Sequence, residues 1–86
     1  MDLQELRKEI DRIDREIVEL YLKRMETAEA IGAWKRENGT AVRDPERERQ
    51  LLDKVAEMAG TENEAGIREL FTLLMAQSRA RQERHA

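Results

Sequence analysis

Residues 2–37 form a long stretch without proline and with one glycine, and this stretch limits the fold more than any other feature of the sequence. Its apolar residues recur at steps of three and four, which is the spacing of one helix face that packs against a partner. These residues are Leu3, Leu6, Ile10, Ile13, Ile17 and Leu20. The sequence therefore predicts a single helix over about residues 2–37.

Two shorter helices are expected after the first. The Asn-Gly pair at 38–39 is a stop signal, and Asp44 followed by proline is a start signal with Asp44 as the N-cap, so a second helix is predicted over about 45–59. A third helix is predicted over about 64–83. Few aromatic and few β-branched residues favour helices over strands. We therefore expect an all-α fold that forms a single domain over residues 1–86.

The expected first helix is too long for a compact monomer of this size. Thirty-five residues span about 52 Å as a helix, whereas a compact chain of 86 residues has a radius of gyration of about 12 Å. Much of the Leu/Ile face would then lie in water. We expect a homodimer in which two long helices pair antiparallel about a two-fold axis. The alternative is a free-standing three-helix monomer, whose small core would be marginal.

Composition excludes several classes of function. The net charge is −3, from 16 Lys and Arg against 19 Asp and Glu, and this argues against a general nucleic-acid binder. The chain has no cysteine, and its one histidine is His85, so we expect no metal site and no catalysis by a Cys or Ser–His nucleophile. No apolar run is long enough to span a membrane. The N-terminus lacks the apolar core of a signal peptide, so we expect a cytoplasmic protein.

Polar side chains interrupt the apolar stripe at one end of each predicted helix. They are Arg24 and Lys35 in the first helix, Asp44, Arg47 and Glu48 in the second, and Ser78 and Gln82 in the third. Up-down-up packing would bring these three ends together into a buried polar pocket with an excess of cations. Buried cations need partners, and the fork of an arginine matches a carboxylate. The pattern therefore indicates an anionic, carboxylate-bearing ligand.

Each of these residues also has an ordinary structural explanation. Arg24 can extend to solvent from an apolar position, and Lys35 suits the dipole at the end of a helix. Capping alone would explain Asp44, and the first turn of a helix often carries an exposed ion pair. Polar residues near the end of the third helix are also consistent with fraying. The coincidence of all three interruptions favours a pocket.

Arg7 extends this hypothesis to a second chain. It lies 17 positions before Arg24, about 25 Å along the same helix, so no small ligand reaches both within one chain. An antiparallel partner helix centred near Ile17 would bring its own Arg7 close to position 27. Each pocket of a dimer would then receive Arg7 from the other subunit. The alternative is an exposed Arg7 paired with Asp11, four residues later.

Taken together, these residues resemble those of the all-helical chorismate mutase family, over essentially the whole chain. The most specific part is the segment 32–52, which contains Val-Arg-Asp-Pro-Glu-Arg-Glu-Arg at 42–49. The resemblance implies conversion of chorismate to prephenate, on the branch towards phenylalanine and tyrosine. It also implies an intertwined, domain-swapped homodimer with no cofactor.

The resemblance also implies a role for each residue. Arg7 of the partner chain and Arg24 would hold the two carboxylates of the substrate. Lys35 and Gln82 would donate to the ether oxygen of the breaking bond, and Glu48 would accept from the ring hydroxyl. Three further residues would complete the binding shell: Asp44, Arg47 and Ser78.

This chemistry is consistent with a sequence that has no cysteine and has its one histidine at position 85. The reaction is a concerted Claisen rearrangement that needs no nucleophile, proton transfer, metal or cofactor, only positioning and stabilisation of growing negative charge. Two alternatives stay open. An isochorismate-pyruvate lyase would share the fold and much of the pocket, and a non-catalytic helical dimerisation module would share the Leu/Ile face. The sequence does not test docking onto another enzyme of the shikimate pathway.

Overall fold

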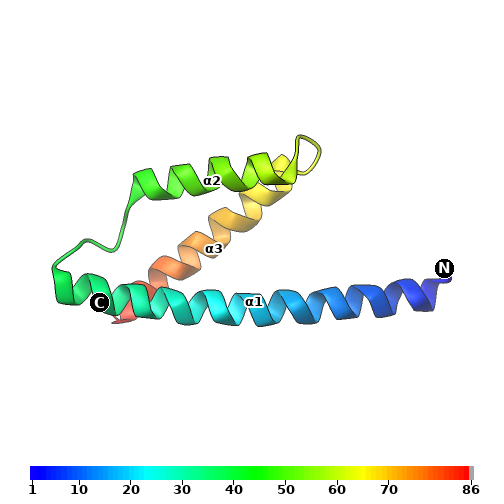
Figure 1. Cartoon of the computed structure of the whole chain (residues 1–86), viewed down its shortest axis with the longest axis horizontal. Helices are drawn as coiled ribbons and strands as arrows, with labels where there is room; N and C mark the ends of the chain where they lie inside the picture. Colours follow the sequence, from blue (N-terminus) through cyan, green and yellow to red (C-terminus); the bar gives the residue numbers. More distant parts are fainter. Residues whose placement is uncertain (86) are drawn as a thin grey trace.

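Three α-helices make up most of the chain in the computed structural model, which describes residues 1–85 (Figure 1). They are α1 (Leu3–Asn38), α2 (Pro45–Ala59) and α3 (Glu64–His85). No strand occurs within the described residues, and the predicted all-α class is confirmed. Within the same part of the chain, no helix is both long and apolar enough to cross a membrane.

Local signals at both ends of α1 explain its bounds. Asp2 is the N-cap and its carboxylate accepts from the backbone N–H of Glu5 at 2.9 Å, while Glu5 reaches back to the N–H of Asp2, which forms a capping box. At the other end Gly39 adopts φ 63°, a left-handed conformation that favours glycine. Nothing between these signals breaks the helix, so 36 residues form one continuous element.

The bounds of α2 and α3 also follow from local chemistry. Asp44 caps α2, because its side chain accepts from the N–H of Arg47 at 3.1 Å, and Gly60 ends the helix with φ 83°. α3 continues to His85, about two residues past the end predicted from the sequence. Its last turn contains good helix formers and neither Gly nor Pro, which accounts for the difference. Ala86 lies outside the described residues.

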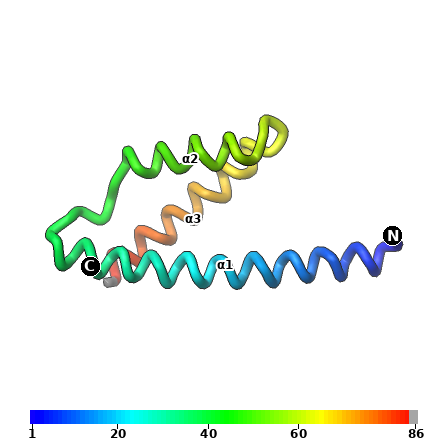
Figure 2. Tube along the Cα trace, viewed as in Figure 1, coloured from blue at the N-terminus to red at the C-terminus, as the bar shows by residue number. Residues whose placement is uncertain are grey.

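The three helices make an open, elongated chain rather than a globule. α3 packs against both α1 and α2, whereas α1 and α2 do not pack directly on each other in the described residues. In Figures 1 and 2, α3 runs from the end of α2 to the second half of α1, and the first half of α1 extends beyond both other helices. The extents are 55 × 26 × 14 Å and the radius of gyration is 16.0 Å.

The apolar core is small and is formed by a few residues from each of the three helices. It consists of Met25 and Ala28 of α1, Val55 and Ala56 of α2, and Met75 of α3. The six residues of the predicted Leu/Ile face of α1 are all exposed, by between 37% at Ile13 and 64% at Leu20. A contiguous apolar face of this kind is typical of an interaction surface.

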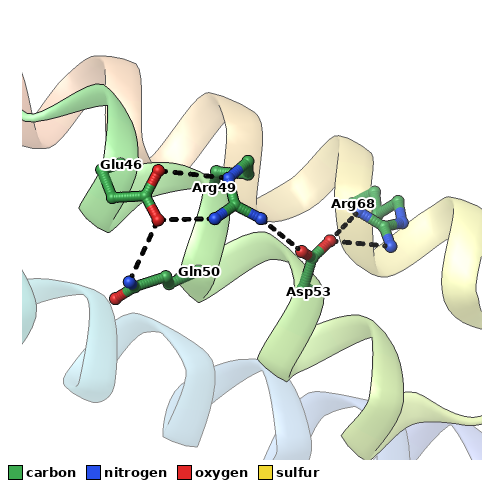
Figure 3. Close-up of polar contacts among 5 residues, drawn as sticks. All are labelled: Glu46, Arg49, Gln50, Asp53 and Arg68. Carbon is green, nitrogen blue, oxygen red and sulfur yellow. Dashed lines mark hydrogen bonds and ion pairs between the residues drawn. The ribbon is translucent and has the colours of Figure 1, made fainter.

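A ladder of ion pairs and hydrogen bonds joins the outer faces of α2 and α3 (Figure 3). Glu46 accepts from Arg49 at 2.5 Å and from Gln50 at 3.2 Å, Arg49 reaches Asp53 at 3.5 Å, and Asp53 accepts from Arg68 of α3 at 3.4 Å. Only the last contact crosses between helices. Because these side chains are exposed, water and salt screen each pair and it adds little to stability. Apolar contacts therefore stabilise the packing of α2 on α3 more than these exposed ion pairs and hydrogen bonds do.

Candidate active site

A cavity of about 430 Å³ lies between the helices at the polar residues that interrupt their apolar stripes. Seven of the eight residues predicted from the sequence line it: Arg24, Lys35, Asp44, Arg47, Glu48, Ser78 and Gln82. Apolar side chains of all three helices, among them Ile31, Leu51 and Met75, complete the wall. A mostly apolar cavity with a few converging polar groups is the usual form of a small-molecule site.

Arg24 joins α1 to α3 at one side of the cavity. Its guanidinium donates to the hydroxyl of Ser78, which is buried, and to the backbone carbonyl of Leu74 at 3.5 Å. It also lies 6.0 Å from the centre of the Phe71 ring, within range of a cation–π contact. Arg24 is thus held in the structure and does not extend freely to solvent. Its position is set before any ligand arrives.

The electrostatics of this side favour an anion. Burial lowers the pKa of Arg24, and the positive charge of Arg47 lowers it further. Arginine nevertheless stays protonated in proteins, so two cations share one partly buried cavity. An anionic ligand between the two guanidinium groups would relieve this repulsion. It would also provide the favourable interactions that these groups lose when burial removes water from them.

Lys35 of α1 and Gln82 of α3 form a pair of donors in the same cavity. The ammonium of Lys35 donates to the backbone carbonyl of Val42 at 2.7 Å and to Oε1 of Gln82 at 3.0 Å. An ammonium has three N–H groups and can only donate, so it fixes which end of the Gln82 amide faces it. One N–H of Lys35 and the NH₂ group of Gln82 remain available to an acceptor in the cavity.

Gly32 allows the helix that carries Gln82 to approach α1. A Cβ atom at position 32 would lie 2.5 Å from the carbonyl oxygen of Gln82, a distance that real Cβ contacts do not show. The sequence alone identified Gly32 only as a glycine inside the first helix. A glycine in the interior of a helix lowers helix stability by about 1 kcal/mol relative to alanine. The presence of such an unfavourable residue was the sequence signal for close packing of another helix there.

Gly32→Ala is expected to lower the free energy of unfolding by about 1–3 kcal/mol, because α3 must shift to accept the new methyl group. This outweighs the gain in helix propensity. Gly66→Ala is the matched control, since nothing lies within 4 Å of the corresponding Cβ position. Urea denaturation of both variants checks the prediction. Equal stability of the two would contradict the close approach.

Glu48 and Arg79 form an ion pair between α2 and α3 at the edge of the cavity. Nη1 of Arg79 donates to Oε2 of Glu48 at 2.7 Å, and both residues line the cavity. Sequence reasoning missed Arg79. Its position, four residues after Met75 and three before Gln82, puts it on the same face of α3, and this spacing could have identified it.

Arg7 is the one predicted residue that the chain does not bring to the cavity. It lies exposed in the first half of α1, which extends away from the other helices. α1 is one continuous helix that runs straight in Figure 2, and Arg7 lies 17 positions before Arg24 in it, so the two side chains of one chain cannot meet.

Comparison with known proteins gives the family. The model of the family described as chorismate mutase type II matches residues 6–83, which include every cavity residue discussed above. The chain belongs to this family. The match includes both the cavity and most of the exposed face of α1.

This chain aligns with most of the length of some relatives and with only a small part of others. A chorismate mutase of Methanocaldococcus jannaschii is 31% identical, over 96% of this chain and 86% of its own length. A bifunctional chorismate mutase/prephenate dehydratase of Aquifex aeolicus is 46% identical over 54 residues, but this chain covers only 15% of its length. A conserved hypothetical protein from Pyrococcus furiosus has a solved structure that superposes with a TM-score of 0.79, at 38% identity over 93% of each chain.

Proposed function

We propose that this protein is a chorismate mutase, an isomerase that converts chorismate to prephenate on the branch towards phenylalanine and tyrosine. The observation that carries the proposal is the Lys35–Gln82 donor pair in a cavity that also contains Arg24 and Arg47. A dicarboxylate that rearranges by moving electrons towards an ether oxygen needs cations for its carboxylates and fixed donors for that oxygen.

The reaction divides into two tasks for the protein. Arg24 binds one carboxylate and thereby helps to hold the enolpyruvyl arm over the ring, which removes much of the entropic cost of reaching the reactive geometry. Lys35 and Gln82 donate to the ether oxygen as its bond to the ring breaks and negative charge grows there. Glu48 accepts from the ring hydroxyl, while Asp44, Arg47 and Ser78 complete the binding shell.

The active form is proposed to be an intertwined homodimer with two equivalent sites. The exposed Leu/Ile face of α1 supports this, because a second copy would cover it. Antiparallel pairing about Ile17 places the partner's Arg7 opposite Thr27, since both positions lie ten residues from the centre. Thr27 lines the cavity. The partner's Arg7 would then bind the second substrate carboxylate.

Mixing two inactive variants tests the shared site. Arg7→Ala and Lys35→Ala are each expected to be inactive alone, because every site in either dimer lacks one residue. Refolding them together in equal amounts creates mixed dimers in which one site is intact. Activity should return to about a quarter of the wild-type value, because half of the dimers are mixed and each has one good site of two. Activity no greater than the mean of the parents would contradict the arrangement.

The experiment that tests the proposed function supplies the purified protein with chorismate and with isochorismate in separate reactions. The two substrates differ in the position of the ring hydroxyl, which Glu48 is proposed to contact. Prephenate formed from chorismate is the expected result, identified by its acid-driven conversion to phenylpyruvate. Release of pyruvate from isochorismate, with chorismate left unchanged, would instead identify a lyase.

A further inference from the structure

We propose that Arg79 is a positioning residue that acts on catalysis through Glu48. It holds one oxygen of the Glu48 carboxylate and so leaves the other oxygen directed to the ring hydroxyl of the substrate. The inference rests on the proposed function, and it goes beyond it by assigning a role to a residue that does not itself contact the reacting atoms.

The geometry of the pair supports this assignment. Nη1 of Arg79 lies 2.7 Å from Oε2 of Glu48, a short distance typical of a charge-assisted hydrogen bond. The side chains are only 27% and 21% exposed, so solvent screens the contact little. Within residues 1–84, Oε1 of Glu48 accepts no hydrogen bond. Glu48 therefore has one oxygen anchored on α3 and one oxygen available to a ligand in the cavity.

The other cations of the cavity explain why such an anchor is needed. Arg24 and Arg47 line the same cavity as Glu48, and a carboxylate without its own partner is attracted to them. Contact with either cation would occupy a group that is proposed to bind the substrate. By pairing with Glu48 from α3, Arg79 keeps the carboxylate at the cavity wall and leaves those two arginines to the substrate.

A direct role for Arg79 makes a different prediction. As a further cation that touches the substrate, it would contribute the same factor whether or not Glu48 carries a carboxylate. As a positioning residue, it should contribute only while that carboxylate is present. The two roles therefore differ in whether the effects of changing Arg79 and Glu48 are independent.

A double-mutant cycle separates the two roles. Arg79→Ala, Glu48→Gln and the double variant are compared with the wild type in kcat/KM for chorismate. We expect Arg79→Ala to lower kcat/KM by about tenfold in the wild type and by less than about twofold in the Glu48→Gln background. Arg79→Gln, which keeps most of the length of the side chain, is measured in the same cycle. Equal factors in both backgrounds would overturn the assignment.

Two further variants show whether the loss is specific. Arg79→Lys, which retains a cationic donor, should recover activity to within about threefold of the wild type. Arg81→Ala is the matched control. Arg81 lies on α3 like Arg79, pairs with Glu29 of α1 at 2.8 Å, is similarly exposed and does not line the cavity. It should change kcat/KM by less than about twofold. A tenfold loss in Arg81→Ala would instead indicate a general effect on α3 and overturn the assignment.

The outcomes also separate this inference from the function on which it rests. A folded wild-type protein that leaves chorismate unchanged overturns both. An active wild type in which Arg79→Ala and Glu48→Gln act independently overturns only the role of Arg79.

Discussion

Replacing Arg24 with leucine is expected to lower kcat/KM for chorismate by about 10²- to 10³-fold without lowering the free energy of unfolding. The loss of activity follows because a hydrogen-bonded charge that binds a substrate carboxylate is worth about 2–5 kcal/mol. Stability is retained because a partly buried cation facing Arg47 is exchanged for an apolar side chain of suitable size. The hydroxyl of Ser78 can then donate to the carbonyl of Leu74, four residues earlier in α3.

The same variant separates an enzyme from a non-catalytic helical module. A module needs only the Leu/Ile face of α1, so it would gain stability from Arg24→Leu and lose no function. Kinetics on chorismate, together with urea denaturation, give the two readouts. Arg68→Leu is the control, since Arg68 is paired with Glu64 on the outer face of α3 and lies away from the cavity. An Arg24→Leu variant with wild-type kinetics would contradict the proposed site.

Lys35→Ala is expected to lower kcat by about 10²- to 10³-fold and to change KM much less. Removing one preorganised donor to a developing oxyanion typically costs about 3–4 kcal/mol, and the role proposed for Lys35 is that of such a donor, which acts mainly in the transition state. The variant also frees the amide of Gln82, which Lys35 holds through Oε1. Steady-state kinetics on chorismate give kcat and KM separately.

The pattern of the loss decides the role of Lys35. Unchanged kcat with a raised KM would show that Lys35 contributes only to substrate binding, and the ether-oxygen assignment would then be wrong. Lys23→Ala is a suitable control, because Lys23 is an exposed lysine of the same helix and does not line the cavity. It should leave both constants within about twofold of the wild type.

The helices could be predicted because their signals are local. Gly39 at the end of α1 and Asp44 at the start of α2 act on their immediate neighbours, so their effect is visible in the sequence. The cavity residues could be grouped for a related reason. A charged residue such as Arg24, placed in an otherwise apolar stripe, stands out against helical periodicity even before the partner helix is known.

Helical spacing could have put Arg79 on the cavity face of α3, but the roles of Gly32 and Arg79 could not be assigned from the sequence because both depend on tertiary packing. The need for glycine at position 32 arises only from the carbonyl of Gln82, fifty residues later. Arg79 lies in a helix end rich in charged residues, where its pairing with Glu48 is one of several local alternatives. Such long-range contacts have no sequence periodicity of their own.

The disappearance of the diene absorbance of chorismate on addition of the purified protein is the most direct test of the proposed function. A chorismate mutase that uses Arg24 should remove this absorbance rapidly, with prephenate as the product, and the Arg24→Leu variant should give almost no acceleration at the same concentration. A folded dimer that leaves chorismate unchanged, or an Arg24→Leu variant as fast as the wild type, would contradict this prediction.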